Sequence, residues 1–187
     1  MYITIIMKFN IIASLCKNKG IGRNGYIPWN NSIMYSNLFS KLTRGNGNNA
    51  VVMGSNTYDN VFIEGYKPFN GRQNLVLSKY MSFNDESPYS NLEFFPNTDK
   101  LLSNCQKYKY DEVWIIGGET VFYDFMSGKN NVPIKNIYLN YINNDYDCDS
   151  FFPMRFDENQ NINFINTSVI DNIEQVLVKI DYNRIPS

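Results

Sequence analysis

Two segments of the chain join a buried-strand pattern to a group that suits an anion. In the first, the run VWIIGG at residues 113–118 is apolar until it ends in two glycines, and residues 119–125 then have the pattern of a helix start. Adjacent glycines at a strand-to-helix turn let the backbone approach a ligand closely, and the free N–H groups of the first helical turn favour a phosphate. This segment predicts a site for a phosphorylated ligand.

The second segment, GRQNLVLS at residues 71–78, places Arg72 just ahead of a buried strand and Ser78-Lys79 at its far end. A planar guanidinium suits a carboxylate, and a Ser-Lys pair suits a phosphate. Either segment alone also fits an ordinary turn or strand entry. A third motif, an apolar strand at residues 10–15 followed by the loop GIGRNGYIPW at residues 20–29, makes an ordered set of three.

Length and composition predict one globular domain over residues 1–187. The chain has 187 residues, of which 43% are hydrophobic, and it contains no repeat or linker. Residues 1–7 are apolar but too short to span a bilayer, so they are expected to be an N-terminal extension or a lengthened first strand. The formal charge of -1 gives no general attraction to nucleic acid or to an anionic membrane, and neither is an expected partner.

The cysteines argue against both a disulfide scaffold and an ordinary zinc site. There are three of them, Cys16, Cys105 and Cys148, widely spaced and without a CxxC pair, and the chain has no histidine. No metal is expected. A reducing compartment fits this cysteine usage, so the expected location is cytoplasmic.

Hydrophobic periodicity predicts an alternating order of strands and helices. Strands are expected over residues 10–15, 50–54, 74–78, 113–116 and 137–142, and near residues 162–170 and 175–181. Helices are expected over residues 33–43, 98–108 and 120–126. Apolar strands separated by helices predict an α/β fold with a mostly parallel central sheet, helices on both faces and a C-terminal antiparallel hairpin.

Taken together, these motifs resemble those of the dihydrofolate reductase family. The resemblance covers residues 8–182 and is carried by NIIASL, GIGRNGYIPW, VVMGSNTY, GRQNLVLS, VWIIGGETVF, IYLNYI and DCDSFFP. It implies a monomer whose ligands collect at the carboxyl ends of the strands. It also implies that NADPH gives a hydride to C6 of dihydrofolate while N5 gains a proton.

The resemblance implies a role for individual residues around the substrate. The loop at residues 20–26 would close over the nicotinamide, with Trp29 at its end, and Arg72 would fork onto the α-carboxylate of the substrate's glutamate. Phe39, Val61 and Phe69 would pack against the rings, although each also fits a purely core role. The residues expected to contact the substrate are Ala13, Phe39, Val61, Phe69, Arg72 and Asn140.

A longer set of residues is implied for the cofactor. The family usually has a basic side chain at the position of Ser55 or Asn56, and both are neutral here, so Lys79 is the remaining cation and NADPH is favoured over NADH only narrowly. The residues expected to contact the cofactor are Ala13, Gly20, Ile21, Gly22, Gly54, Ser55, Asn56, Thr57, Ser78, Lys79, Ile116, Gly117, Gly118, Glu119, Thr120, Val121 and Phe122.

The largest departure from the family lies in the helix after Trp29. The family has a buried Asp or Glu there, which binds N3–H and the 2-amino group of the pterin. Six residues after Trp29 stands Tyr35, and no acidic residue precedes Asp59. A phenol with a reference pKa of about 10 stays neutral, so Tyr35 is either a modified catalytic residue or plain aromatic filling.

Two further substitutions fall in the same pocket. The family threonine that braces the acid corresponds to Asn140, whose carbonyl oxygen could still bind the pterin amino group, and a family tyrosine near the nicotinamide corresponds to Phe122. The pocket has therefore been either rewired or lost. Residues 149–153 either anchor a loop near the site or form a structural turn.

Three hypotheses follow. The first is a working dihydrofolate reductase with an altered pterin pocket, which would supply tetrahydrofolate for thymidylate synthesis and one-carbon metabolism. The second is a binding protein that keeps the fold without catalysis. The third is a reductase of the same fold that acts on another pteridine or a pyrimidine. Arg72 favours the first over the third, because a substrate without a glutamate tail has no use for it.

Overall fold

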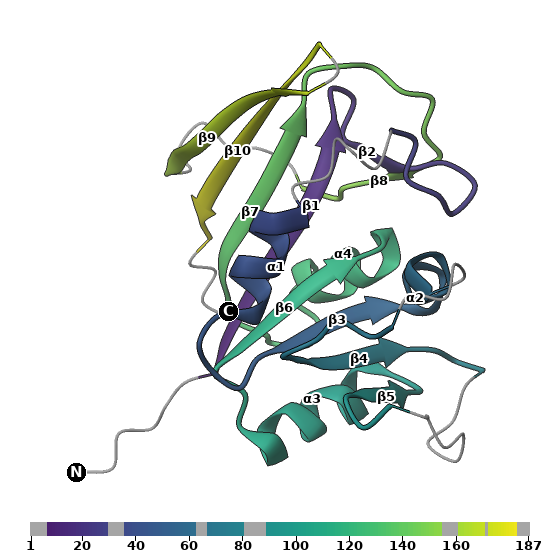
Figure 1. Ribbon diagram of the computed structural model, residues 1–187. Helices are drawn as coiled ribbons and strands as arrows, with labels where there is room; N and C mark the ends of the chain where they lie inside the picture. Colours follow the sequence, from purple (N-terminus) through teal and green to yellow (C-terminus); the bar gives the residue numbers. More distant parts are fainter. Residues whose placement is uncertain are drawn as a thin grey trace.

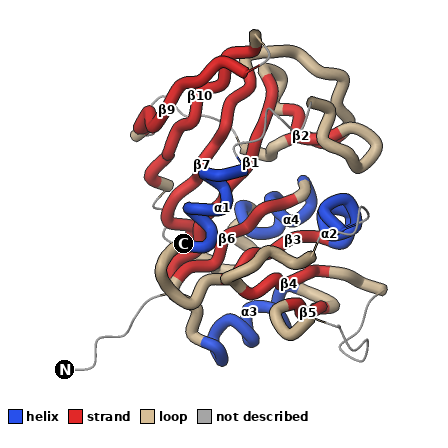
Figure 2. The backbone as a smooth tube through the Cα atoms, in the orientation of Figure 1, coloured by secondary structure: helices blue, strands red, loops and turns tan. Residues whose placement is uncertain are grey.

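The computed structural model describes residues 7–29, 36–62, 67–80, 89–154, 161–170 and 172–182, without the side chains of residues 36, 37, 61 and 62. Eight strands form one sheet in the order β5-β4-β3-β6-β1-β7-β10-β9 (Figures 1 and 2). Their bounds are β1 Lys8–Cys16, β3 Ala50–Gly54, β4 Gln73–Leu77, β5 Leu92–Phe95, β6 Glu112–Gly117, β7 Ile134–Ile142, β9 Ile162–Ile170 and β10 Ile173–Asp181. A small second sheet pairs β2 Gly20–Gly22 with β8 Ser150–Phe151.

The large sheet is parallel except at its C-terminal end. β1 runs parallel to both β6 and β7, and β3, β4 and β5 continue the parallel part on the other side of β6. β10 is antiparallel to β7 and to β9, and the last two strands form a hairpin. This confirms the predicted mostly parallel sheet with a C-terminal antiparallel pair.

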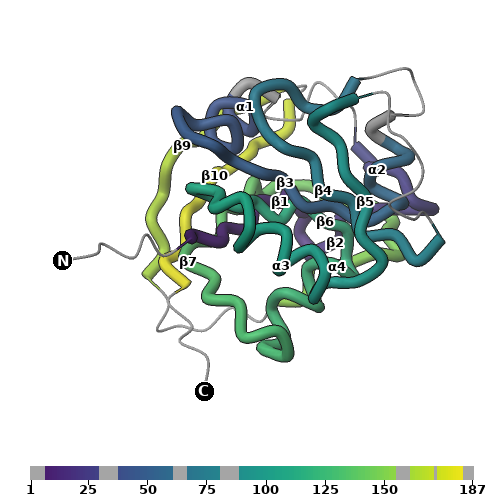
Figure 3. Tube along the Cα trace, turned by 90° about the horizontal axis from the view of Figure 1, so that it is seen from below, coloured from purple at the N-terminus to yellow at the C-terminus, as the bar shows by residue number. Residues whose placement is uncertain are grey.

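Helices cover both faces of the sheet, as Figure 3 shows from below. Leu42 of α1 Ser36–Arg44 and Tyr58 of α2 Ser55–Phe62 pack against an apolar cluster on one face, which we call the α1 face. Leu101 of α3 Thr98–Tyr108 and Phe125 of α4 Glu119–Met126 belong to a larger cluster on the opposite face. No helix in the described part of the chain is long and apolar enough to cross a membrane.

The alternation of side chains along β1 explains how one strand serves two layers. Phe9, Ile11 and Leu15 point into the larger cluster, whereas Ile12 packs on the α1 face. A period of two is what a strand buried on both sides requires. Each fully buried aliphatic side chain of this kind contributes about 1.5–3 kcal/mol relative to leaving it exposed.

β1 and β6 separate from each other at their carboxyl ends. They pair from Lys8 opposite Glu112 to Ile11 opposite Ile115, after which β1 continues alone with β7 as far as Cys16 opposite Ile142. β6 meanwhile ends at Gly117 and leads into α4. Crevices of this kind, at the carboxyl ends of parallel strands, are where α/β sheets bind ligands.

Several elements differ from the sequence-based expectation. Helix α2 and strands β2, β5 and β8 were not predicted. Residues 55–57, which were predicted to contact the cofactor, form the start of α2. Helix α1 ends at Arg44, one residue beyond the prediction, and its expected first residues 33–35 lie outside the described part of the chain, as do residues 1–6 of the expected extension. β6, β7 and β10 each begin one to three residues earlier than expected.

Candidate active site

Arg72 lies beside a pair of aromatic rings at the amino end of β4. Phe39 of α1 and Phe69 of the turn before β4 have ring centroids 5.3 Å apart, and the Arg72 Cζ atom lies 5.8 and 5.3 Å from the two centroids. Both distances are within the range of cation–π attraction. The structure therefore brings together three of the residues predicted to contact the substrate.

The Arg72 guanidinium is buried among neutral acceptors. Its side chain is only 7% exposed; Nη1 donates to Thr43 Oγ1, Nη2 donates to Ser40 Oγ over 3.4 Å, and Nε donates to the Asn70 carbonyl over 3.2 Å. Burial, and then the nearby Arg44, lower the pKa of Arg72 to about 10. No carboxylate among the described residues forms a salt bridge with it. A buried cation in this state favours an anionic ligand.

The turn that carries Phe69 and Arg72 is held by a buried amide. Asn74 Oδ1 accepts from the Phe69 N–H over 3.1 Å, and Nδ2 donates to the carbonyls of Phe69, Arg72 and Asn91 at 3.1, 3.2 and 3.1 Å. Asn91 Nδ2 donates to two of the same carbonyls, at 3.1 and 3.3 Å. Asn74 thus fixes the backbone from which the aromatic ring and the cation project.

Two strand-to-helix turns meet at the carboxyl ends of β3 and β6. A Cβ atom added to Gly54 would lie 3.1 Å from Val121 Cγ2, and one added to Gly118 would lie 3.6 Å from Thr57 Oγ1. The first turns of α2 and α4 therefore approach each other, and both present N–H groups that have no partner within their own helix. Such a pair of helix N-termini suits the phosphates of a dinucleotide.

Gly117 makes the second of these turns possible. Its φ of 110° lies in a region that favours glycine, and its peptide bond to Gly118 is cis. A Cβ atom at Gly117 would lie 2.9 Å from the ring of Phe122, which is itself buried against Phe152. Phe122 is therefore part of the core beneath the turn.

The charges near these turns are mixed. Ser55 and Asn56 open α2 without a charge, Lys79 is exposed beyond β4 next to the buried Ser78, and Glu119 is an exposed acid in the first turn of α4. Lys79 would attract a phosphate, whereas Glu119 would repel one at short range.

A band of neutral polar side chains crosses the α1 face near the carboxyl ends of β1 and β7 and the amino end of the antiparallel β10. Asn140 Nδ2 donates to Gln175 Oε1 over 3.0 Å and to Ser14 Oγ over 3.4 Å. Asn140 and Gln175 are 4% and 0% exposed, yet Asn140 Oδ1 and Gln175 Nε2 have no hydrogen-bond partner among the described residues. Buried amide atoms of this kind are rare unless a ligand or water completes them. We call Ser14, Asn140 and Gln175 the polar band.

Trp29 lies beside the polar band. It packs in a cluster with Cys16 and Ile142 and meets the Tyr146 ring edge-on at 5.6 Å. Within the part of the chain that the structure describes, its buried Nε1 atom also has no hydrogen-bond partner. Ala13, half-buried on β1, lies one residue before Ser14 where β1 has already left β6. Trp29 Nε1 and the polar band thus place several buried polar atoms, unpaired with any described residue, at one end of the sheet.

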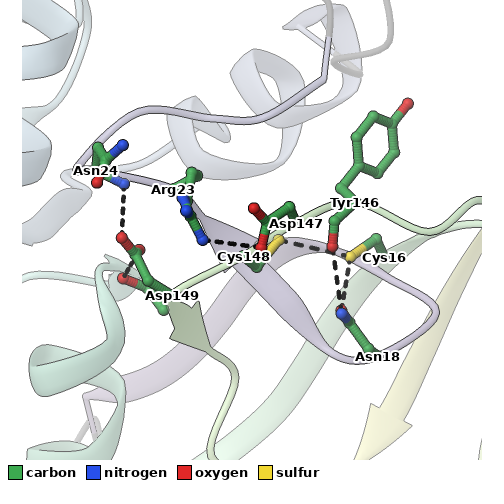
Figure 4. Close-up of polar contacts among 9 residues, drawn as sticks. Cys16, Asn18, Arg23, Asn24, Tyr146, Asp147, Cys148 and Asp149 are labelled. Carbon is green, nitrogen blue, oxygen red and sulfur yellow. Dashed lines mark hydrogen bonds and ion pairs between the residues drawn. The ribbon is translucent and has the colours of Figure 1, made fainter.

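The loop at residues 17–26 is fastened to residues 143–152 (Figure 4). Arg23 forms an ion pair with Asp147 at 2.8 Å, and the Asn24 N–H donates to Asp149 Oδ2 over 2.8 Å. These bonds support the pairing of β2 with β8, which includes Gly20, Ile21 and Gly22. Residues 149–153 therefore do anchor a loop at this end of the molecule.

Two of the predicted site residues fall wholly or partly outside the described part of the chain. Tyr35 lies outside the described residues, and Val61 lies in α2 with its side chain outside them. Sequence reasoning, in turn, overlooked Thr43, Asn74 and Gln175. The signal that was present for Gln175 is its parity with Leu177 on β10, which predicts an inward-facing polar side chain.

Comparison with known proteins gives a consistent result. The chain matches the family described as dihydrofolate reductase over residues 8–183. It is 30% identical to the dihydrofolate reductase of Heliothis virescens over 180 residues, which cover 94% of each protein. It is 31% identical to that of Drosophila melanogaster over 155 residues, covering 79% of this chain and 80% of the relative. It is also 30% identical to the viral dihydrofolate reductase of Saimiriine herpesvirus 2 over 153 residues, covering 80% and 70%.

Proposed function

The chain belongs to the dihydrofolate reductase family, and from this premise we propose that it reduces 7,8-dihydrofolate to 5,6,7,8-tetrahydrofolate with NADPH. The tetrahydrofolate would support thymidylate synthesis and one-carbon metabolism. The relatives named above are called dihydrofolate reductases, and the chain matches one of them over nearly its whole length.

The observation that carries the proposal is the buried cation beside a pair of aromatic rings. Dihydrofolate ends in an aromatic benzoyl group followed by a glutamate, so it offers a ring to Phe39 and Phe69 and a carboxylate to Arg72. The carboxylate would replace weak contacts to neutral oxygens by charge-assisted bonds, which are worth about 1.5–3 kcal/mol each. It would also relieve the cost of burying the guanidinium.

The residues around the two glycine turns fit a dinucleotide. Bound NADPH would supply the hydride. The first turns of α2 and α4 would receive its phosphates, with Thr57 as a hydroxyl donor beside Gly118. Lys79, which follows Ser78 just beyond β4, is the cation that would bind the additional phosphate of NADPH. We therefore expect a modest preference for NADPH over NADH.

The pterin would lie over the polar band. Asn140 Oδ1 is a buried acceptor that no described residue pairs with, so it would accept one N–H of the pterin in place of one oxygen of the family's carboxylate. A neutral amide makes a weaker bond than an anion, and the difference corresponds to about a 10- to 100-fold loss of affinity. Tyr35, six residues after Trp29, would add a neutral hydroxyl, and the proton for N5 would come from solvent.

The direct test is the rate of NADPH absorbance loss when dihydrofolate is added, with NADH as the comparison. Arg72→Leu should raise the KM for dihydrofolate about 30-fold or more, since removing one partner of a buried charge pair costs about 2–5 kcal/mol, and leave the KM for NADPH near its original value. Arg44→Leu is a matched control, because Arg44 is an exposed neighbour outside the aromatic pair. Equal effects on both KM values would refute the assignment of Arg72 to the tail.

A non-catalytic binding protein is the second candidate, and the tyrosine at position 35 is the observation that favours it. Such a protein would bind dihydrofolate or NADPH, detectable as a change in the fluorescence of Trp29 and Trp114, without consuming NADPH at high protein concentration. That combined result would reject catalysis and keep the binding site.

A further inference from the structure

Two thiols that the proposed reaction does not use lie face to face at the base of the loop at residues 17–26. Cys16, the last residue of β1, and Cys148, in the segment before β8, have Sγ atoms 3.9 Å apart (Figure 4). They are 132 residues apart in the sequence. Cys16 is fully buried, whereas Cys148 is half-buried. Their approach is therefore a product of the fold.

Hydrogen bonds hold the backbone on both sides of the pair. Cys16 Sγ donates to Asn18 Oδ1 over 2.9 Å, and the same oxygen accepts from the Gly20 N–H over 2.9 Å. Asn18 Nδ2 donates to the Tyr146 carbonyl over 3.3 Å, which ties the loop to the segment that carries Cys148. The bonds from Arg23 to Asp147 and from Asn24 to Asp149 tie the two segments again, one on each side of Cys148 in the sequence.

The loop also leaves room for the Cys148 side chain. Any Cβ atom at Gly20 would overlap Cys148 Sγ and Cβ, so the glycine is required for the cysteine to occupy this place. A disulfide has an S–S distance of about 2.05 Å, so the sulfur atoms need to approach by about 2 Å. Rotation of the half-buried Cys148 side chain toward Cys16 is the movement that this requires.

We propose that Cys16 and Cys148 form a reversible disulfide when the protein meets an oxidising small-molecule disulfide such as glutathione disulfide. The Cys148 thiolate, the more accessible of the two, attacks one glutathione sulfur and releases the other as a thiolate. Cys16 then loses its proton and attacks the Cys148 sulfur, which forms the protein disulfide and expels the second glutathione thiolate. Two protein thiols are oxidised by two electrons, and one glutathione disulfide becomes two glutathiones that take up the two protons.

The third cysteine provides an internal control. Cys105 lies in α3 with no exposed surface and belongs to the core cluster on the opposite face of the sheet. Burial raises the pKa of its thiol to about 12, but access is what distinguishes it from the pair: Cys105 has no exposed surface for glutathione disulfide to reach, whereas Cys148 is half-buried. In the folded protein Cys105 is therefore expected to stay reduced under conditions that oxidise the pair.

The bridge would join the start of the loop at residues 17–26 covalently to the segment at residues 143–149. In the reduced protein these segments are held by hydrogen bonds and one exposed ion pair, which open locally at small cost. After oxidation, opening of the loop base would require movement of both segments together. This inference concerns the loop itself and holds whether or not the proposed reaction takes place.

The test is to treat the full-length protein with glutathione disulfide, alkylate the remaining thiols, digest, and analyse the peptides by mass spectrometry. We expect a Cys16–Cys148 linked peptide that dithiothreitol abolishes, with Cys105 reduced. Cys148→Ser should give no linked peptide, and Cys105→Ala should give as much as the parent protein. A product with glutathione on Cys148 and no link, or a link that involves Cys105, would overturn the proposal.

Two physical readouts accompany the chemical one. Oxidation should raise the Tm by about 4–16 °C, because a disulfide that closes a long segment restricts the unfolded chain. It should also slow trypsin cleavage after Lys17 and Arg23 about tenfold, because cleavage follows the population of the opened loop. If Cys148→Ser showed the same two changes on oxidation, the bridge would not be their cause and the proposal would fail.

Discussion

Replacing Asn74 by alanine is expected to weaken the binding of dihydrofolate while leaving the binding of NADPH nearly unchanged. The amide of Asn74 bonds the backbone of Phe69, Arg72 and Asn91, and it is completely buried. Without it, the turn that presents the aromatic ring and the guanidinium loses its fixed geometry. The glycine turns at β3 and β6 have no bond to this amide, so the proposed cofactor site should be unaffected.

The size of the effect follows from the bonds that remain. The carbonyls of Phe69 and Arg72 also accept from Asn91 Nδ2, and the Asn91 carbonyl also accepts from the Asn74 backbone N–H at 2.8 Å. The uncompensated losses are the acceptor for the Phe69 N–H and the volume of the amide. We expect a decrease of about 2–4 kcal/mol in the free energy of unfolding, and a Tm lower by about 4–16 °C.

Steady-state kinetics and thermal unfolding test this together. Displacing Arg72 forfeits part of a charge-assisted bond, so the KM for dihydrofolate should rise about 10-fold. Asn91→Ala is the matched control: Asn91 donates to the same two carbonyls from a half-buried position, and its loss should cost about 1 kcal/mol. The reasoning is refuted if Asn91→Ala is as damaging as Asn74→Ala, or if Asn74→Ala raises both KM values equally.

Three further outcomes are expected. Gly117→Ala places a side chain at a φ of 110° and 2.9 Å from the buried ring of Phe122, so it should lower the Tm by about 2–12 °C and raise the KM for NADPH. An unchanged KM for NADPH would show that this turn does not bind the cofactor. Tyr35→Glu should raise turnover or shift its pH dependence, and a fall in activity would give the phenol a role of its own. Burial, then the charge and hydrogen bond of Cys16 and the nearby Asp147, raise the pKa of Cys148 to about 11. The rate at which iodoacetamide alkylates Cys148 should therefore rise about tenfold per pH unit from neutrality and keep rising above pH 9. A plateau of this rate near pH 9 would contradict the expectation.

The sequence predicted the main sheet because its strands are continuous apolar runs between helices. β3 and α3 have the predicted bounds, since each is bordered by clear turn or capping residues, such as Asn97, which caps α3 by accepting from the Lys100 N–H. Helix α2 was missed because SNTYDNVF has few strong helix formers and little amphipathic pattern. β5 has only four residues and depends on its pairing with β4, which no local pattern reveals.

Some residues of the candidate site could likewise be predicted from the sequence, and others could not. Arg72 could be named in advance because it stands in the motif GRQNLVLS, and Phe39 and Phe69 because the family resemblance implied them; the structure brings the three together. Their roles toward a ligand stay predictions. The polar band was only partly foreseen, because the bond between Asn140 and Gln175 joins two strands whose register depends on the whole sheet. The contact between Cys16 and Cys148 depends in the same way on long-range folding.

The short pairing of β1 with β6 affects how the two halves of the sheet are coupled. Only four residue pairs, from Lys8–Glu112 to Ile11–Ile115, connect β5, β4, β3 and β6 to β1, β7, β10 and β9 within the sheet. Beyond Ile11 the two halves are held to each other by side chains of their shared core cluster and not by backbone hydrogen bonds between β1 and β6. A molecule that touches both halves at the carboxyl ends of these strands would add contacts where the sheet itself has none, so amide exchange should slow in both halves when it binds.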